Sequence, residues 1–121
     1  MTNLRIVRDG LEVVSRIGKA LDHPLRVRAL AALLVRELCV CELIELFGLA
    51  PSTISKHMSV IADSGLIVRR REGKWTYYVR ATGTIGPVAD ALSLVDSLVA
   101  DDPLVASDRE RIPTLYCRSD E

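Results

Sequence analysis

The sequence predicts a mainly α protein with one small β-hairpin, for three reasons. Apolar residues recur at helical spacing over most of the chain, and two runs rich in β-forming residues flank a Glu-Gly-Lys turn at residues 72–74. The 121 residues are 49% hydrophobic and 26% charged, a balance typical of globular proteins. A chain of this length suits a single domain.

Two helices are predicted before residue 36. Apolar residues at helical spacing favour an amphipathic helix over about residues 8 to 20. Asp22 or His23 then caps a second helix, in which Pro24 suits the first turn and the apolar stripe continues to about Val35.

A pair of shorter helices follows. The first covers Val40 to Phe47 and ends at Gly48, which can take the left-handed conformation that terminates a helix. Pro51 is compatible with the start of the next helix, which continues to about Asp63. Two short helices around a glycine turn indicate a helix-turn-helix.

The second half of the chain adds the hairpin and one more helix. Residues 66–71 and 75–80 read as its two strands, and apolar spacing predicts a last amphipathic helix over about residues 88 to 100. The remaining tail is charged and weakly patterned. Its apolar residues Ile112, Leu115 and Tyr116 are expected to dock it on the body near Cys117.

The formal net charge of zero conceals an uneven distribution. Basic residues predominate between residues 52 and 80, and acidic residues predominate from residue 101 onward. Nucleic-acid binding by a neutral chain requires such a locally basic face. Residues 1–10 carry charges where a secretory signal needs an apolar stretch, so we expect a cytoplasmic protein without a membrane partner.

The helix that begins near Pro51 has two distinct faces. Ile54, Met58, Ile61 and Ala62 share an apolar arc, and the opposite arc is small and polar. By itself this polar arc could be a solvated surface. The hairpin that follows is rich in arginine and can grip the DNA backbone or minor groove, which favours a DNA-reading helix instead. The candidate DNA-binding residues are Ser52, Thr53, Ser55, Lys56, His57, Ser59, Arg70, Arg71 and Lys74.

Several segments resemble the ArsR/SmtB family of bacterial metal-responsive repressors, in particular its arsenic-responsive type. They are residues 22–26, 37–43, 51–58, 64–67 and 72–78. The resemblance implies a winged helix-turn-helix homodimer, paired through its first and last helices, that represses a palindromic operator until an inducer binds. It also implies a DNA role for Ser55 and His57; a partly buried histidine satisfied by backbone is the alternative for His57. We therefore expect a DNA-binding and dimerisation domain over residues 1–100 and a C-terminal tail over residues 101–121.

Three cysteines in a chain without an export signal are expected to be reduced thiols. Cys39 and Cys41 stand at the start of the third predicted helix, where the helix dipole favours the thiolates that bind soft ions. The resemblance implies trivalent arsenic or antimony, As(III) or Sb(III), as the inducer. Arsenic-responsive members carry a Cys-x-Cys-x-x-Cys run, but Ile44 occupies the third position here. Cys117, from the same or the other subunit, is the candidate third metal ligand; an incidental tail thiol is the alternative.

The spacing of the thiol pair suggests a switch. Residues two apart on a regular helix point about 200° apart, so a shared ion should distort the first turn and shift a dimer away from its DNA-competent shape. A thiol redox or persulfide sensor, with a bond from Cys39 or Cys41 to Cys117, is the alternative function. DNA binding itself requires no cofactor under either hypothesis. We expect no enzyme, because the sequence lacks a nucleophile pair, a phosphate-binding glycine loop or a catalytic carboxylate pair.

Overall fold

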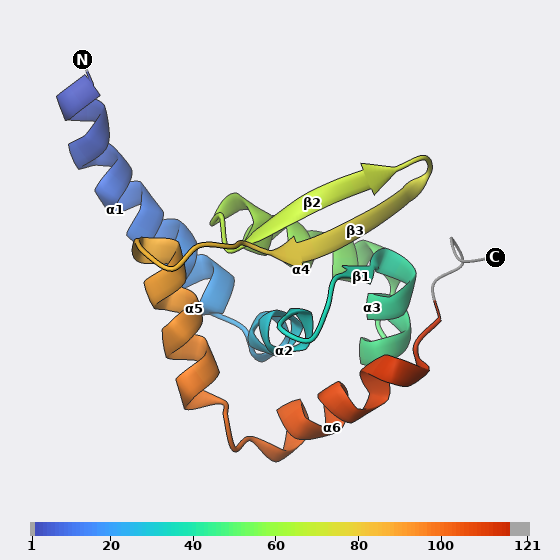
Figure 1. The fold of residues 1–121 in the computed structure, drawn as a ribbon. Helices are drawn as coiled ribbons and strands as arrows, with labels where there is room; N and C mark the ends of the chain where they lie inside the picture. Colours follow the sequence, from blue (N-terminus) through green and yellow to red (C-terminus); the bar gives the residue numbers. More distant parts are fainter. Residues whose placement is uncertain (1, 117–121) are drawn as a thin grey trace.

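The protein is mainly helical, with a three-stranded antiparallel sheet that forms a wing beside a helix-turn-helix (Figure 1). The computed structural model describes the backbone of residues 2–116 and the side chains from residue 10 onward. The helices and the small antiparallel sheet confirm the predicted fold class. Within this described part, no helix combines the length and apolar character that crossing a bilayer would require.

The helices account for most of the chain. They are α1 (Thr2–Leu21), α2 (Pro24–Leu33), α3 (Val40–Phe47), α4 (Pro51–Asp63), α5 (Pro87–Leu98), α6 (Pro103–Arg111) and the short 3-10 helix η1 (Ile112–Thr114). The strands are β1 (Leu38–Cys39), β2 (Ile67–Glu72) and β3 (Trp75–Arg80). Helix α1 begins earlier than the sequence predicts, and its N-terminal half projects away from the body (Figure 1).

Helix α2 lies at the centre of the core. Of the two predicted caps, Asp22 and His23, the structure selects His23, whose Nδ1 accepts the Leu25 N–H at 3.0 Å, and Pro24 occupies the first turn. The apolar arc predicted for α4 is buried at Ile54, Met58 and Ile61. Buried side chains of α2, α3, α4 and the sheet share one cluster. This core fixes α3 and α4, the two helices of the helix-turn-helix, relative to each other.

The sheet has the strand order β1-β3-β2. Glu72 pairs with Trp75, so only Gly73 and Lys74 form the loop, and Gly73 takes the positive φ of 61° that a two-residue hairpin loop needs. The hairpin prediction is confirmed. The sequence did not indicate β1, which pairs Leu38 with Tyr78 and Cys39 with Tyr77. This pairing connects the start of α3 directly to the wing.

The C-terminal tail is more ordered than its sequence pattern suggests. Instead of a weakly patterned segment it forms α6 and η1, and Asp102 caps α6 by accepting the N–H groups of Leu104 and Val105 at 2.9 and 3.0 Å. The docking predicted for Ile112 and Leu115 is confirmed, because both are buried, whereas Tyr116 is 52% exposed. Helix α6 crosses beneath α2 and brings the chain to α3 (Figure 1).

Candidate DNA-binding surface and thiol site

The polar arc of α4 is open to solvent. Ser52, Ser55, Lys56 and Ser59 are exposed, and Thr53 flanks them half-buried. Ala50 precedes the helix and provides no side-chain cap, and Pro51 occupies the first turn. The amide groups of such a helix start are suited to an anionic partner.

His57 lies at the edge of this arc and is held by another side chain. Arg26 Nη1 lies 3.0 Å from His57 Nδ1, and the His23 and His57 ring centroids are 4.5 Å apart. Burial lowers the pKa of His57, and the neighbouring His23 and Arg26 lower it further. The contact is thus with Arg26, and the histidine is neutral near pH 7.

The basic residues of the wing divide between the two faces of the hairpin. Arg69 donates to Ser59 Oγ at 3.2 Å and lies over the Tyr78 ring, so it borders α4. Strand alternation places Arg71 on the same face. Arg69 is not among the candidate DNA-binding residues predicted from the sequence. Strand alternation could have identified it, because it places Arg69 on the same face of the hairpin as Arg71.

Arg70 points to the opposite face. It lies over the Tyr77 ring at 4.4 Å from the centroid and forms ion pairs with Glu37 and Glu72. The hydrogen bond to Glu37 is the main cause that raises the pKa of Arg70. Lys74, at the tip of the wing, lies over the Trp75 ring at 5.3 Å from the centroid.

The two described cysteines occupy different surroundings at the start of α3. Cys39 is the last residue of β1 and the N-cap of α3, with only 1% of its surface exposed. Cys41 lies in the first turn of the helix and is half-buried. The predicted position at the helix start is confirmed, and only Cys41 borders open space.

Cys41 lines a cavity of about 500 Å³ between α3, β3 and the C-terminal segment. Ile44 and Glu45 on α3, Trp75 on β3 and Tyr116 complete its lining. Cys117 lies outside the described residues, and in the sequence it directly follows Tyr116. Among residues 10–116, no three His, Cys, Asp or Glu side chains are grouped closely enough to hold a metal ion.

A buried carboxylate connects the thiol pair with the C-terminal segment. Glu42 Oε1 accepts the Cys39 N–H at 3.0 Å, and Arg36 Nη2 donates to Glu42 Oε2 at 2.8 Å and to the Ile112 carbonyl at 3.1 Å. Burial by itself would raise the pKa of Glu42, but the hydrogen bonds from Arg36 and from the Cys39 N–H outweigh it and the pKa lies below its ordinary value. Glu42 is therefore an ionised acceptor that fixes the first turn of α3.

Helix α6 is attached to α2 through an ion pair and to α3 through hydrogen bonds to backbone carbonyls. Asp108 is buried and accepts two hydrogen bonds from Arg28 on α2, at 2.9 and 2.8 Å. Arg111 donates to the carbonyls of Leu46 and Glu45 at the end of α3, at 2.8 and 3.2 Å. The tail thus contacts the middle of α2 and the C-terminal end of α3.

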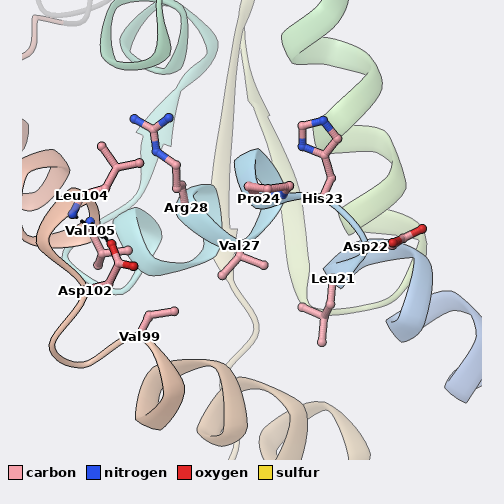
Figure 2. Close-up of a pocket in the computed structure, with 10 residues that line it drawn as sticks. All are labelled: Leu21, Asp22, His23, Pro24, Val27, Arg28, Val99, Asp102, Leu104 and Val105. Atoms are coloured by element: carbon pink, nitrogen blue, oxygen red, sulfur yellow. Dashed lines mark hydrogen bonds between the residues drawn. The ribbon is translucent and has the colours of Figure 1, made fainter.

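A second cavity, of about 470 Å³, lies between α2, α5 and α6 (Figure 2). Leu21, Val27 and Val99 extend toward its centre, whereas the Arg28 guanidinium and the His23 imidazole point away from it (Figure 2). Of the two acids that line it, Asp102 is engaged in capping α6, and the Asp22 carboxylate points away from the other lining side chains (Figure 2). This cavity therefore offers aliphatic surface and no convergent polar groups.

The chain is similar to known DNA-binding regulators. A family model described as bacterial regulatory protein, arsR family, matches residues 23–68. An HTH-type transcriptional regulator of Methanocaldococcus jannaschii is 31% identical over 88 residues, which cover 72% of this chain and 96% of that protein. The chain belongs to the arsR family of bacterial regulatory proteins. This family is one of DNA-binding transcriptional regulators and not a class of enzymes.

Other relatives of this ArsR-family protein have names that refer to arsenic resistance. The arsenical resistance operon repressor of Bacillus subtilis is 36% identical over 61 residues, 50% of this chain and 58% of that repressor. The chain spans only about a third to three fifths of several such relatives. Among solved structures, a homodimeric winged helix-turn-helix domain from Mycobacterium bovis superposes with a TM-score of 0.66 at 29% identity, covering 79% of this chain and 86% of that one.

Proposed function

We propose that this ArsR-family protein is a repressor that binds a palindromic operator as a homodimer and is released when trivalent arsenic or antimony binds its cysteine thiolates. One observation carries the proposal: Cys39 is at once the N-cap of α3 and the backbone partner of Tyr77 in the wing. A change at the thiol pair therefore acts on both DNA-binding elements. We expect the protein to act in the cytoplasm.

The exposed polar arc of α4 and the wing form the proposed DNA surface. A helix of this kind fits the major groove, where small polar side chains and lysine reach base edges and phosphates. The wing then lies over the adjacent backbone or minor groove. Arg71 and Lys74 serve there directly, and Arg70 serves through the N–H groups that Glu37 and Glu72 leave available. The candidate set is Ser52, Thr53, Ser55, Lys56, His57, Ser59, Arg70, Arg71 and Lys74.

Apolar surface on α1 and α5 supports the homodimer. Leu11 and Val14 on α1 are 75% and 71% exposed, and Leu98 on α5 is 74% exposed. Burial of such helical stripes against a second copy gains hydrophobic free energy in a domain of this size. A two-fold axis then sets two α4 helices about 34 Å apart, as successive major grooves require.

We assign the thiol site to Cys39, Cys41 and Cys117. Trivalent arsenic takes three thiolates, and Ile44 cannot supply the third. The route of α6 and η1 supports Cys117 from the same subunit, because Tyr116 already lines the Cys41 cavity and consecutive Cα atoms are about 3.8 Å apart. In this division residues 1–100 bind DNA and dimerise, and residues 101–121 deliver the third sulfur.

The switch follows from the different surroundings of the two described thiols. Cys39 faces the core and Cys41 faces the cavity, so one ion reaches both sulfurs only if the first turn of α3 rearranges. That rearrangement disturbs the β1–β3 pairing and the Glu42 contacts together. A coupling free energy of about 1–3 kcal/mol, typical of allosteric proteins, weakens operator binding roughly 5- to 150-fold.

The decisive experiment titrates the operator-bound protein with arsenite under reducing conditions. Wild type should be released, and Cys39→Ser, Cys41→Ser and Cys117→Ser should each resist release while binding the operator normally. Adding Ile44→Cys to the Cys117→Ser variant should restore release, because it rebuilds a Cys-x-Cys-x-x-Cys run. An unchanged operator affinity of wild type in arsenite refutes the inducer assignment; an oxidant-dependent bond to Cys117 found by mass spectrometry would instead support the redox sensor.

A further inference from the structure

Arg26, in the first turn of α2, joins three helices through one guanidinium group. Its Nη2 and Nε donate to the Lys19 carbonyl at 2.7 and 3.1 Å, and Nε also lies 3.3 Å from the Ala20 carbonyl. Both carbonyls belong to the last turn of α1. Its Nη1 is directed at His57 Nδ1, 3.0 Å away on α4.

This contact determines which nitrogen of His57 carries the proton. Arginine can only donate, so Nδ1 must be the unprotonated acceptor and the hydrogen of the neutral ring resides on Nε2. The charged and titratable groups facing the ring are Arg26 of α2 and the imidazole of His23, the N-cap of that helix, while α1 contributes only carbonyls to the Arg26 contact. Both side-chain neighbours disfavour a second proton on His57.

The position of Nε2 is suited to a partner outside the protein. In the described part of the chain, every buried side-chain nitrogen has a hydrogen-bond partner. The hydrogen bond of the His57 ring involves Nδ1, so Nε2 is not buried and reaches solvent. His57 is one turn beyond Thr53, on the flank of the polar arc rather than at its centre. A side chain on that flank faces the DNA backbone when the arc faces the bases.

We propose that Arg26 is a positioning residue that holds His57 as the Nε2–H tautomer, so that His57 presents a neutral hydrogen-bond donor to an operator phosphate. This inference rests on the proposed operator binding. Because the same guanidinium is anchored on the last carbonyls of α1, the donor keeps its place only while α1 keeps its place against α2. A shift of α1, the helix proposed to pair in the dimer, therefore moves a DNA contact on α4.

The first test is spectroscopic and needs no DNA. In ¹⁵N-labelled wild type near pH 7, the His57 ring should give the pattern of an Nε2–H tautomer, with Nδ1 unprotonated. Arg26→Lys keeps the charge but loses the fork that spans α1 and α4, so His57 should become a mixture of tautomers while His23 is unchanged. A wild-type ring that is charged, or protonated on Nδ1, overturns the proposal.

The second test uses a duplex selected by the wild-type protein from a random-sequence pool. His57→Gln keeps a donor near the Nε2 position and should bind nearly as wild type, whereas His57→Asn places its amide near Nδ1 and should lose about tenfold, the size of one charge-assisted hydrogen bond at 1.4 kcal/mol per factor of ten. A neutral donor releases no counterion, so the slope of log affinity against log salt should be equal for His57→Asn and wild type.

The outcomes separate this inference from the proposed function. A slope that falls by about one for each lost histidine contact would show a charged His57 and overturn the inference while operator binding stands. Equal affinities of His57→Gln and His57→Asn would also overturn it. If wild type selects no duplex at all, the proposed repressor function fails, whatever tautomer the first test finds.

Discussion

Replacing Glu42 with glutamine should destabilise the protein by about 2 kcal/mol. The Glu42 side chain is 4% exposed and accepts from both Arg36 and the Cys39 N–H. Glutamine keeps one oxygen acceptor, but its amide NH2 group then faces either Arg36 or the Cys39 N–H, both of which are donors. Breaking a buried ion pair costs roughly 3–5 kcal/mol. The expected loss is smaller because the Arg36 side chain is 40% exposed and water solvates the cation that remains.

The pH dependence of this loss has a definite sign. The pKa of Glu42 is lowered in the folded protein, so the stability it contributes is present above its unfolded pKa and is lost as pH falls through the folded value. Urea unfolding at fixed protein concentration should show a constant difference between wild type and Glu42→Gln from pH 6 to 8, and the difference should shrink below the ordinary value of 4.5.

Glu45→Gln is the matched control, because Glu45 lies on the same helix and is exposed. It should change the free energy of unfolding by less than about 0.5 kcal/mol. Equal losses for the two variants, or a Glu42→Gln loss that persists unchanged well below pH 4, would refute the assignment of Glu42 as an ionised, buried acceptor.

Three further predictions concern the tail, the dimer and the wing. Asp108→Asn should cost about 2 kcal/mol of unfolding free energy, since it weakens the buried pair with Arg28; an unchanged urea midpoint would show that α6 is held by other contacts. Leu98→Glu should shift sedimentation toward monomer, and a dimer of unchanged affinity would place the interface elsewhere. Arg69→Ala should weaken operator binding and lower the salt slope by about one per contact; an unchanged slope would show that Arg69 only supports Ser59.

The sequence predicts best where structure depends on local periodicity. The two-faced pattern of α4 and the β-forming runs around Gly73 are readable because neighbouring residues alone determine which side is apolar. His23 as a cap and Gly48 as a helix end follow from equally local rules. These features suffice to predict a helix-turn-helix followed by a β-hairpin, and the resemblance to the ArsR/SmtB family adds the winged arrangement.

Features that depend on distant partners were not predicted. Strand β1 is only two residues long and is defined by its pairing with β3, so no pattern within it indicates a strand. Helix α6 docks through Asp108 and Arg111, and the buried charge of Asp108 interrupts the apolar stripe that would mark a helix. The partner of His57 lies on another helix, at Arg26, which spacing along α4 cannot show.

The brevity of β1 makes its pairing with β3 much shorter than the pairing of β2 with β3. Two paired residues contribute little to the sheet, whereas the six-residue strands β2 and β3 form a long ladder. Leu38 and Cys39 are 0% and 1% exposed, so packing in the core rather than a row of ladder hydrogen bonds holds β1 in place. The Cys39 N–H donates to Glu42 on α3, so a rearrangement of the first turn of α3 reaches the wing through the two buried residues of β1.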